Sequence, residues 1–391
     1  MTFVRYKATE TRLGGRNGDY TIFLDDGKCI YSETWGSGAM NSFAFEGALA
    51  GPRNGLGPAG PFPAAALTDT FDRRWLHYAF LSRDGRHAMV ANAAWLGPVD
   101  DEEPPKERFT TILLLHERGQ PWSASQFNAD IGNEPWSAFR LPHPHFQPYK
   151  LGIAASAGTP RVDLDLVRTS RPCSSQCAFF HGGQHLRWQS ETGVRGSGRW
   201  DLGNGPEPVD LIGYHERVRG RWRWPDLGEW VFGFANDLGG DPGRPPAWAG
   251  VFTFIRPATD TEHATASFML WKDGRMRRHF PRRNVSFAVR GELDRDKVTM
   301  TPPLARLLGV PPMAPVPKRL AIVARQGDDV VMLDFDAEAA ARVVIPSENS
   351  IRPFSVNEVV GDCLLAGRIG GEQFAIETRG IVEFAGGAGG D

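Results

Sequence analysis

The residues best suited to chemistry lie between Ile212 and Asp237, in the stretch IGYHERVRGRWRWPDLGEWVFGFAND. A carboxyl group enclosed by indole rings has to be paired or protonated, because burial disfavours its charged form. A protonated carboxyl of this kind can act as a general acid, and aromatic faces can stabilise a cation that the proton transfer creates. We therefore expect Glu216 to be the catalytic acid or base, with His215 assisting or orienting it.

The segment from Tyr214 to Trp224 reads as a β-strand, in which alternate residues face opposite sides. One side then carries Tyr214, Glu216, Val218, Gly220, Trp222 and Trp224, and the other carries His215, Arg217, Arg219, Arg221 and Arg223. A strand break at either flanking glycine would reverse the alternation. The sequence therefore leaves open which of His215 and Glu216 faces inward.

A turn over residues 225–228 leads to a second alternating run, and together they predict a hairpin with an aromatic wall that bears one carboxylate. The residues expected to bind substrate are Tyr214, Trp222, Trp224, Trp230, Phe232, Trp75 and His77. The structural alternative is that such aromatic residues only fill the core of a sheet, and that the arginine row is an ion-paired outer surface.

These side chains need a framework, and the chain predicts one made of β-strands. Short β-prone runs alternate with turns, as in YTIFLDDGKCIYSETW and in WLHYAFLSRDGRHAMVANAAWLG, where Gly85 follows an aspartate and can take the positive φ of a tight turn. Helical periodicity is limited to the short candidates PPLARLLGV and DAEAAAR. Strands without long intervening helices predict antiparallel sheets in a sandwich or barrel.

The length of 391 residues allows two average domains, and the turn-rich stretch GNGPEP separates two strand-rich halves. We expect an N-terminal β domain over residues 1–205, a C-terminal β domain over residues 206–385 and a flexible tail over 386–391. The Gly- and Pro-rich segment 41–71 is a candidate lid or crossover, because long loops of this kind are often functional.

Composition excludes several classes of function. The formal net charge is −2, which gives no overall attraction to nucleic acid, and no apolar run is long enough to cross a bilayer. Four cysteines in a chain of this length favour a reduced, cytoplasmic protein. His143 and His145 alternate on an extended segment, but no third ligand follows from spacing, so neither a metal site nor a cofactor is expected. Transient membrane contact stays open.

Residues 213–216 (GYHE), followed by Gly220 and the tryptophan-rich stretch, resemble the Gly-Tyr-His-Asp-His-Asn-Trp-Gly signature of the AttH and carotenoid 1,2-hydratase superfamily. The run WLHYAFLSRDGRHAMVAN resembles the early hairpin of that family, and ETRGIVEF resembles its final strand. The chain departs from the signature where Arg217, Val218 and Arg219 replace its second histidine, its asparagine and its tryptophan. An activity that depends on that histidine or asparagine therefore does not transfer.

The resemblance implies two lipocalin-like β domains with a ligand pocket at or near their junction. Relatives of this superfamily include tocopherol cyclase, fungal survival-factor lipid-transfer proteins and natural-product pericyclases. Such a pocket suits an apolar polyene, terpenoid or polyketide. It could protonate a carbon–carbon double bond, orient a polyene for a pericyclic step, or simply carry a lipid.

We therefore predict an all-β protein of two tandem lipocalin-like antiparallel barrel or sandwich domains with few short helices. The expected function is a cofactor-independent lyase or isomerase of the terpenoid cyclase, hydratase or pericyclase kind, which acts on a hydrophobic substrate by proton-assisted cyclisation, hydration or isomerisation. The alternatives are a non-catalytic carrier of an apolar small molecule and an interaction protein with solid cores. Substrate, reaction type and oligomeric state are left open.

Overall fold

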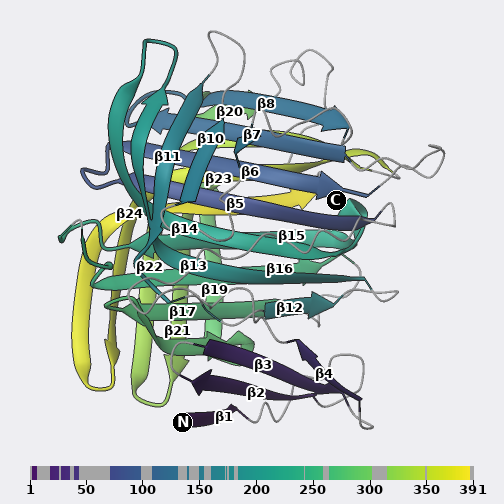
Figure 1. Cartoon of the computed structure of the whole chain (residues 1–391), viewed down its shortest axis with the longest axis vertical. Helices are drawn as coiled ribbons and strands as arrows, with labels where there is room; N and C mark the ends of the chain where they lie inside the picture. The colour runs from purple at the N-terminus through teal and green to yellow at the C-terminus, as the bar shows by residue number, and fades with distance from the viewer. Residues whose placement is uncertain are drawn as a thin grey trace.

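The computed structural model describes residues 2–6, 18–25, 28–35, 39–43, 71–97, 108–130, 139–140, 149–153, 160–171, 173, 176–179, 184–241, 243–258, 264–301, 315–347 and 350–387. Figure 1 shows these residues folded almost entirely as strands, and the helical elements among them are the 3-10 turns η3 (Trp224–Asp226), η5 (Arg282–Asn284) and η6 (Arg295–Lys297). Within the described residues no helix has the length and apolar character that crossing a bilayer requires.

The amino-terminal strands form two sheets. The small sheet has the order β1-β2-β3-β4, with β1 (Thr2–Tyr6), β2 (Gly18–Asp25), β3 (Lys28–Trp35) and β4 (Ala39–Phe43). A second sheet, which we call the N-terminal sheet, has ten strands in the order β8-β7-β6-β5-β14-β13-β11-β10-β9, with β12 paired to β13. Its strands are β5 (Asp72–Ser82), β6 (His87–Leu96), β7 (Arg108–Glu117), β8 (Ser123–Asp130), β9 (Phe139–Arg140), β10 (Tyr149–Ile153), β11 (Arg161–Arg168), β12 (Gln176–Phe179), β13 (His185–Asp201) and β14 (Glu207–Arg221).

The remaining strands form the C-terminal sheet, also of ten strands, in the order β18-β17-β16-β15-β24-β23-β22-β21-β19 with β20 paired to β22. Its strands are β15 (Leu227–Asn236), β16 (Trp248–Pro257), β17 (Thr265–Lys272), β18 (Arg275–Pro281), β19 (Val285–Glu292), β20 (Val298–Thr301), β21 (Pro317–Gln326), β22 (Asp329–Ser347), β23 (Ser350–Ile369) and β24 (Glu372–Gly387). All described pairings are antiparallel except that of β20 with β22. The predicted all-β class is confirmed.

Turn chemistry explains the first hairpin of the N-terminal sheet. Gly85 has a φ of 67°, and its amide donates a hydrogen bond to the carbonyl of Ser82 at 2.9 Å. Glycine reaches this left-handed conformation without the clash that a Cβ causes. The positive φ predicted after the Arg83-Asp84 pair is therefore present, and it joins β5 to β6.

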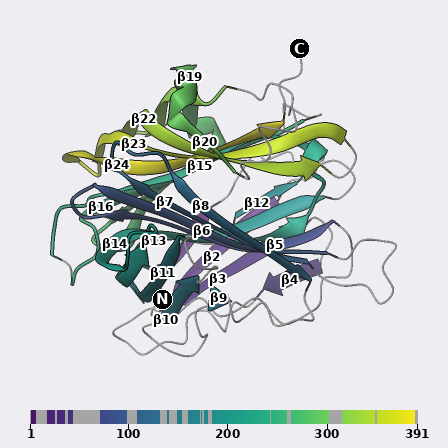
Figure 2. The same cartoon turned by 90° about the horizontal axis from the view of Figure 1, so that it is seen from above.

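The buried apolar residues form three layers. One cluster lies within the N-terminal sheet and includes Tyr78, and another lies within the C-terminal sheet and includes Leu333. A third contains residues of both sheets, such as Tyr214 and Phe234, whose rings stack with centroids 5.6 Å apart. Figure 2 shows the C-terminal sheet as a layer stacked on the N-terminal sheet. The third cluster is therefore the interface between the two sheets.

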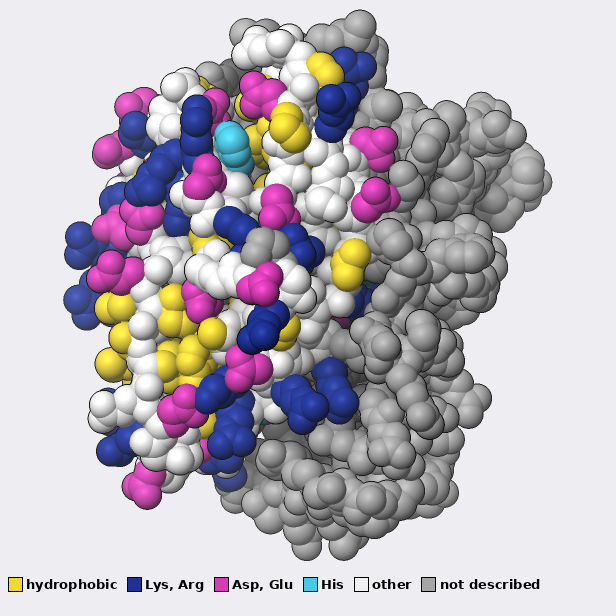
Figure 3. Space-filling model, turned by 60° about the vertical axis from the view of Figure 1, so that its left-hand side comes forward, with side chains coloured by type: hydrophobic (Ala, Val, Ile, Leu, Met, Phe, Trp, Pro, Cys, Tyr) yellow, Lys and Arg dark blue, Asp and Glu magenta, His cyan; other side chains and the backbone are white. Residues whose placement is uncertain are grey.

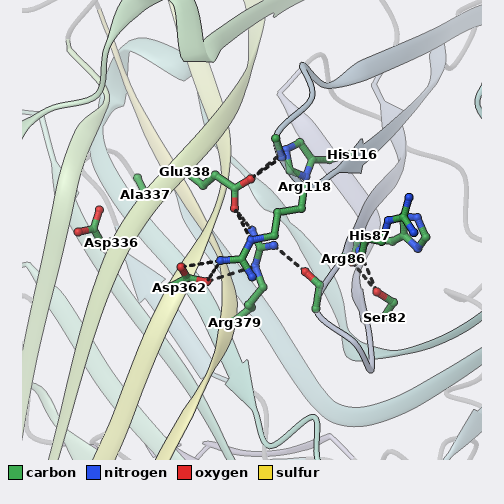
Figure 4. A network of polar contacts seen from close by, with 12 residues as sticks. Ser82, Arg86, His87, His116, Arg118, Asp336, Ala337, Glu338, Asp362 and Arg379 are labelled. Atoms are coloured by element: carbon green, nitrogen blue, oxygen red, sulfur yellow. Dashed lines mark hydrogen bonds and ion pairs between the residues drawn. The ribbon is translucent and has the colours of Figure 1, made fainter.

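A group of polar contacts, which we call the polar clamp, fastens one end of this interface (Figure 4). Arg379 donates to the carbonyl of Gly85 at 2.6 Å and also to Glu338, whose Oε1 accepts from the backbone amide of residue 119 at 2.9 Å. Arg118 donates to Asp362 at 3.0 Å. The clamp thus ties two turns of the N-terminal sheet to β22, β23 and β24.

One helix expected from the sequence is a strand instead. The segment DAEAAAR, residues 336–342, lies inside β22 and pairs with β23 on either side of a β-bulge. Alanine favours helices weakly, but tertiary packing overrides a preference of that size. Here Ala340 packs in the C-terminal core and Ala341 packs at the interface, so small residues are needed on both faces. The other candidate helix, PPLARLLGV, lies outside the described residues.

The sheets do not change at the turn-rich stretch 203–208. Strand β14 pairs with β13 over its whole length and with β5 from Leu211 onward, so the chain leaves the N-terminal sheet only at η3. The division into domains at residue 205 stays a prediction for folding units, but residues 207–221 belong to the N-terminal sheet. Strand β24 continues to Gly387, within the segment expected to be a tail. Most of segment 41–71, together with His143 and His145, lies outside the described residues.

Candidate functional site

A carboxyl group lies on the interface side of β14. Across β13, β14 and β5, Ser190, Glu216 and His77 are direct neighbours in the register. Glu216 is 4% exposed, and Tyr214 donates a hydrogen bond to its carboxyl group. The Tyr214 hydroxyl also lies 3.2 Å from that of Ser190. Glu216 Oε1 is buried and has no hydrogen-bond partner among the described residues.

The C-terminal sheet brings two more carboxyl groups to the same place. Glu383 of β24 lies directly between Glu358 of β23 and Phe232 of β15 in the register. Glu358 and Glu383 share a hydrogen bond, and the indole N–H of Trp230 donates to Glu383 Oε1. His77 Nδ1 lies 4.0 Å from Glu358 Oε1. We call Glu216, Glu358, Glu383 and His77 the acid cluster, and it spans both sheets.

Burial sets the protonation of the acid cluster. Loss of water raises the pKa of Glu216 well above its ordinary value, and the charge of Glu383 raises it further. Burial likewise raises the pKa of Glu358, with additional contributions from Glu383. Burial raises the pKa of Glu383 too, although the hydrogen bond from Trp230 opposes this. The pKa of His77 falls to about 4 because its imidazole is buried. Burial therefore favours the protonated form of Glu216 and Glu358 and the neutral form of His77.

The same side chains have the spacing of a cation site. His77 Nδ1 and oxygens of Glu358 and Glu383 lie within 4.8 Å of one another. However, the two carboxyl groups are hydrogen bonded to each other, and Trp230 donates to one of them. A carboxyl pair that shares a hydrogen bond holds a proton, and binding of a cation would have to displace that proton. We therefore interpret the cluster as a store of protons, and the expected absence of a metal site stays a prediction.

An aromatic cluster lies beside the acid cluster. The ring of Trp75 stacks on Trp224 at a centroid distance of 6.5 Å and meets the edge of Trp222 at 5.2 Å. Trp230 lies 6.4 Å from Trp75. The guanidinium of Arg73 lies 5.3 Å from the centroid of Trp224, so these rings already hold a cation against an aromatic face.

His215 faces the opposite side of β14. Its ring stacks on Tyr78 at a centroid distance of 4.2 Å, within the core of the N-terminal sheet, and its Nδ1 lies 2.9 Å from the carbonyl oxygen of His77. Its direct register neighbour is Glu191, which forms a buried ion pair with Arg168. Burial lowers the pKa of His215 well below its ordinary value. The sequence left the inward-facing residue open, and the structure places Glu216, not His215, at the interface.

The structure gathers all seven of the predicted substrate-binding residues in one place. Tyr214, Trp222, Trp224, Trp230, Phe232, Trp75 and His77 all contribute to the interface or border it. The sequence predicts that the residues from 214 to 232 form one hairpin, and this is wrong. Strand β14 belongs to the N-terminal sheet and β15 to the C-terminal sheet. The aromatic wall therefore forms by stacking the two sheets. The assignment of these residues to a site stays a prediction.

Sequence reasoning missed Glu358 and Glu383. Each is a single acid within an apolar strand, in the runs VNEVVG and IVEFAG. A lone carboxyl in a strand that is apolar on both sides is costly to bury without a partner, and this was the available signal. The pairing of the two could not be read from the sequence, because it depends on the register between β23 and β24.

A cavity of about 1100 Å³ lies at the other end of the interface, near the polar clamp. Its lining includes Arg118, Asp362 and Arg379. At the aromatic end the indole rings contact one another, but Trp75 and Glu383 keep partial exposure to solvent. A ligand-sized chamber at the acid cluster stays a prediction. Figure 3 shows acidic and basic side chains interspersed over one face of the molecule.

No protein-family model matches the chain, and no curated protein matches its sequence. Among solved structures, a candidate AttH protein from Nitrosomonas europaea aligns with a TM-score of 0.54 and 13% identity, over 84% of this chain and 99% of that protein. Kievitone hydratase from Nectria haematococca aligns at 0.47 and 12%, over 81% and 90%. CghA in complex with Sch210972 aligns at 0.46 and 9%, over 86% and 97%.

The first alignment is the one that supports a shared fold, since the other two scores fall below 0.5. At 13% identity it supports the fold and not an activity. The alignment covers 84% of this chain, so the likeness is not confined to one of the two ten-stranded sheets. The chain therefore has the AttH-like fold, as its mid-chain motif predicts.

Proposed function

We propose that the protein is a proton-transfer enzyme that acts on an apolar polyene, terpenoid or polyketide, with Glu216 as its general acid. The observation that carries this proposal is the position of Glu216, which is buried at the sheet interface with one oxygen lacking a hydrogen-bond partner among the described residues. A carboxyl group that keeps its proton near neutral pH can give it to a carbon–carbon double bond.

The neighbours of Glu216 suit this reaction. Tyr214 donates to the Glu216 carboxyl group, so it stabilises the negative charge that appears when the proton leaves. Trp75, Trp224 and Trp230 offer aromatic faces to the carbocation that forms on the substrate. The acid, its hydrogen-bond donor and the cation-stabilising rings thus lie on one side of the N-terminal sheet or face it.

The solvent exposure of two residues supports the aromatic end as the point where substrate enters. Glu216 itself is buried, but Trp75 and Glu383 at this end are both partly exposed to solvent. An apolar substrate that replaced the ring contacts of Trp75 would lie against indole faces with Glu216 near its double bond. The reaction that follows is cyclisation, hydration or isomerisation, each of which begins with the same protonation.

The experiment is an assay in D₂O with a panel of isoprenoid polyenes, here squalene, geranylgeraniol and retinol, followed by mass spectrometry. Protonation of carbon leaves a deuterium in the product, and hydration adds the mass of one water in addition. Glu216→Gln keeps the shape of the side chain but removes the acid, so deuterium incorporation should fall by about 10²- to 10⁴-fold. Glu229→Gln is the matched control, because Glu229 is exposed and pairs with Arg256.

Equal deuterium incorporation in the wild-type protein and Glu216→Gln would overturn the proposal. A carrier protein would give a third result: the wild-type protein and Glu216→Gln would bind a polyene with the same affinity, and neither would convert it to a product. Tryptophan fluorescence quenching by retinol reports that affinity directly. It separates loss of binding from loss of proton transfer.

A further inference from the structure

Glu358 and Glu383 are a directly opposed pair on neighbouring antiparallel strands. Two like charges in this position repel each other and weaken a sheet. The pair is nevertheless hydrogen bonded, which requires a proton between the two carboxyl groups. Both side chains face the N-terminal sheet, toward Glu216 and His77. The fold therefore builds a carboxylic acid–carboxylate pair into the interface.

The surroundings of the pair are unequal. The indole N–H of Trp230 donates to Glu383 Oε1, whereas Glu358 Oε2 has no hydrogen-bond partner among the described residues and Glu358 is 4% exposed. A hydrogen-bond donor favours the charged form of a carboxyl group, and burial without one favours the neutral form. The negative charge thus belongs on Glu383 and the proton on Glu358.

We propose that Glu383, with its partner Glu358, is the catalytic base that faces the acid Glu216, so that the enzyme relocates a proton within an apolar substrate. This inference rests on the proposed function. It narrows the reaction to an isomerisation or cyclisation that ends in loss of a proton, because acid and base then act on the same molecule from the two sheets.

The proton balance closes without a co-reactant. Glu216 gives its proton to one carbon of a double bond, the π electrons form the new C–H bond, and a cation appears on the neighbouring carbon. Glu383 then removes a proton from an adjacent carbon, and the electrons of that C–H bond form the new double bond. The product has the composition of the substrate, and one proton has moved from Glu216 to Glu383.

The groups that face the pair provide a route for the proton to return from Glu383 to Glu216 after each reaction. His77 approaches Glu358 from β5, and Glu216 and Tyr214 face it from β14. The charge of Glu383 acts on the pKa of Glu216, so the two carboxyl groups are electrostatically coupled. Return of the proton to Glu216 restores the starting state within the cluster. No water has to be consumed in this cycle.

A titration that needs no substrate tests the pair. Carbon-13 NMR of glutamate-labelled protein should show one carboxyl group of the pair titrating well above the other. Glu358→Gln removes the ionisable partner of Glu383, and Trp230→Phe removes the N–H donor to Glu383 while keeping an aromatic ring. We expect Trp230→Phe to raise the pKa of Glu383. If Glu358 and Glu383 titrate independently, each with an ordinary glutamate pKa, the two residues do not share a proton and the proposal is wrong.

The activity arm uses the same D₂O assay with squalene, geranylgeraniol and retinol. Glu383→Gln should lower kcat by about 10²- to 10⁴-fold with little change in KM, and the wild-type product should carry deuterium without added water. Two results would refute Glu383 as the base while keeping Glu216 as the acid. One is a product with added water, and the other is an unchanged kcat in Glu383→Gln when Glu216→Gln is inactive. Wild-type protein that incorporates no deuterium refutes the proposed function and with it the base, whatever the titration shows of the pair.

Discussion

The side chains of His215 and Glu216 lie on opposite faces of β14. His215 stacks on Tyr78 in the core of the N-terminal sheet, whereas Glu216 accepts a hydrogen bond from Tyr214 at the interface between sheets. The two residues therefore do not form one catalytic pair. The hydrogen-bond contact of His215 with the acid cluster is to the backbone, since its Nδ1 lies 2.9 Å from the carbonyl oxygen of His77.

Replacement of His215 by leucine should destabilise the protein without changing the acid. The variant loses the hydrogen bond to the carbonyl of His77 and leaves that buried oxygen less satisfied, which costs about 1–3 kcal/mol. Urea unfolding measures the loss, and carbon-13 NMR measures the pKa of Glu216. A large shift of that pKa in His215→Leu would mean that the two side chains are coupled after all.

The buried histidines should make the protein sensitive to acid. Burial lowers the pKa of His77, His116 and His279 to about 4 from the usual 6.5. Between these values the unfolded chain binds protons that the folded chain does not, so the free energy of unfolding falls as the pH drops from 6.5 toward 4. Each fully shifted histidine contributes roughly 3 kcal/mol.

Urea unfolding at several pH values measures this slope. His279→Gln should make this slope less steep, and because His279 lies on β18, outside the acid cluster, its removal tests histidine desolvation alone. An unchanged slope in this variant would contradict the assignment.

The acid cluster should act in the opposite direction. Glu358 has a raised pKa in the folded protein, so above the ordinary pKa of 4.5 the unfolded chain releases a proton that the folded chain keeps. The contribution of Glu358 to stability is therefore present below that pH and is lost as the pH rises toward the folded pKa. Glu358→Gln should be more stable than the wild type at pH 8 and closer to it at pH 5. Thermal or urea unfolding at both pH values checks this, and lower stability of the variant at pH 8 would contradict it.

The polar clamp gives a prediction about the cohesion of the two sheets. Arg379 is 4% exposed and donates to the partly buried Glu338 and to the carbonyl of Gly85, so Arg379→Met leaves the buried Gly85 carbonyl without this donor. We expect a loss of about 1–3 kcal/mol. Arg118→Met is the control, because Arg118 is half exposed and contacts Asp362, also at the surface. Its effect should stay within about 1 kcal/mol. Similar losses in the two variants, measured by urea unfolding, would argue against a buried clamp.

Local sequence patterns predicted which segments form strands and which residues share a face, but they did not predict how the strands assemble into sheets. Alternation placed Tyr214 and Glu216 on one face of β14, and the structure confirms it. The expected hairpin between β14 and β15 is wrong, because the sheet to which a strand belongs depends on distant partners. Likewise the composition of DAEAAAR favours a helix in isolation, and only packing on both faces explains its strand. Glu383 belongs to the site through a register that no local pattern reveals.

The extra residue Glu338 divides β22 into two halves of opposite alternation. Before it, odd-numbered residues such as Leu333 enter the C-terminal core, whereas beyond it the even-numbered Ala340 does so, and Ala341 turns to the other sheet. A single insertion or deletion after residue 338 would therefore exchange the residues that face the C-terminal core with those that face the interface along that half of the strand. We therefore expect homologous chains to keep the length of this strand, or to pair each insertion in it with a nearby deletion that restores the register.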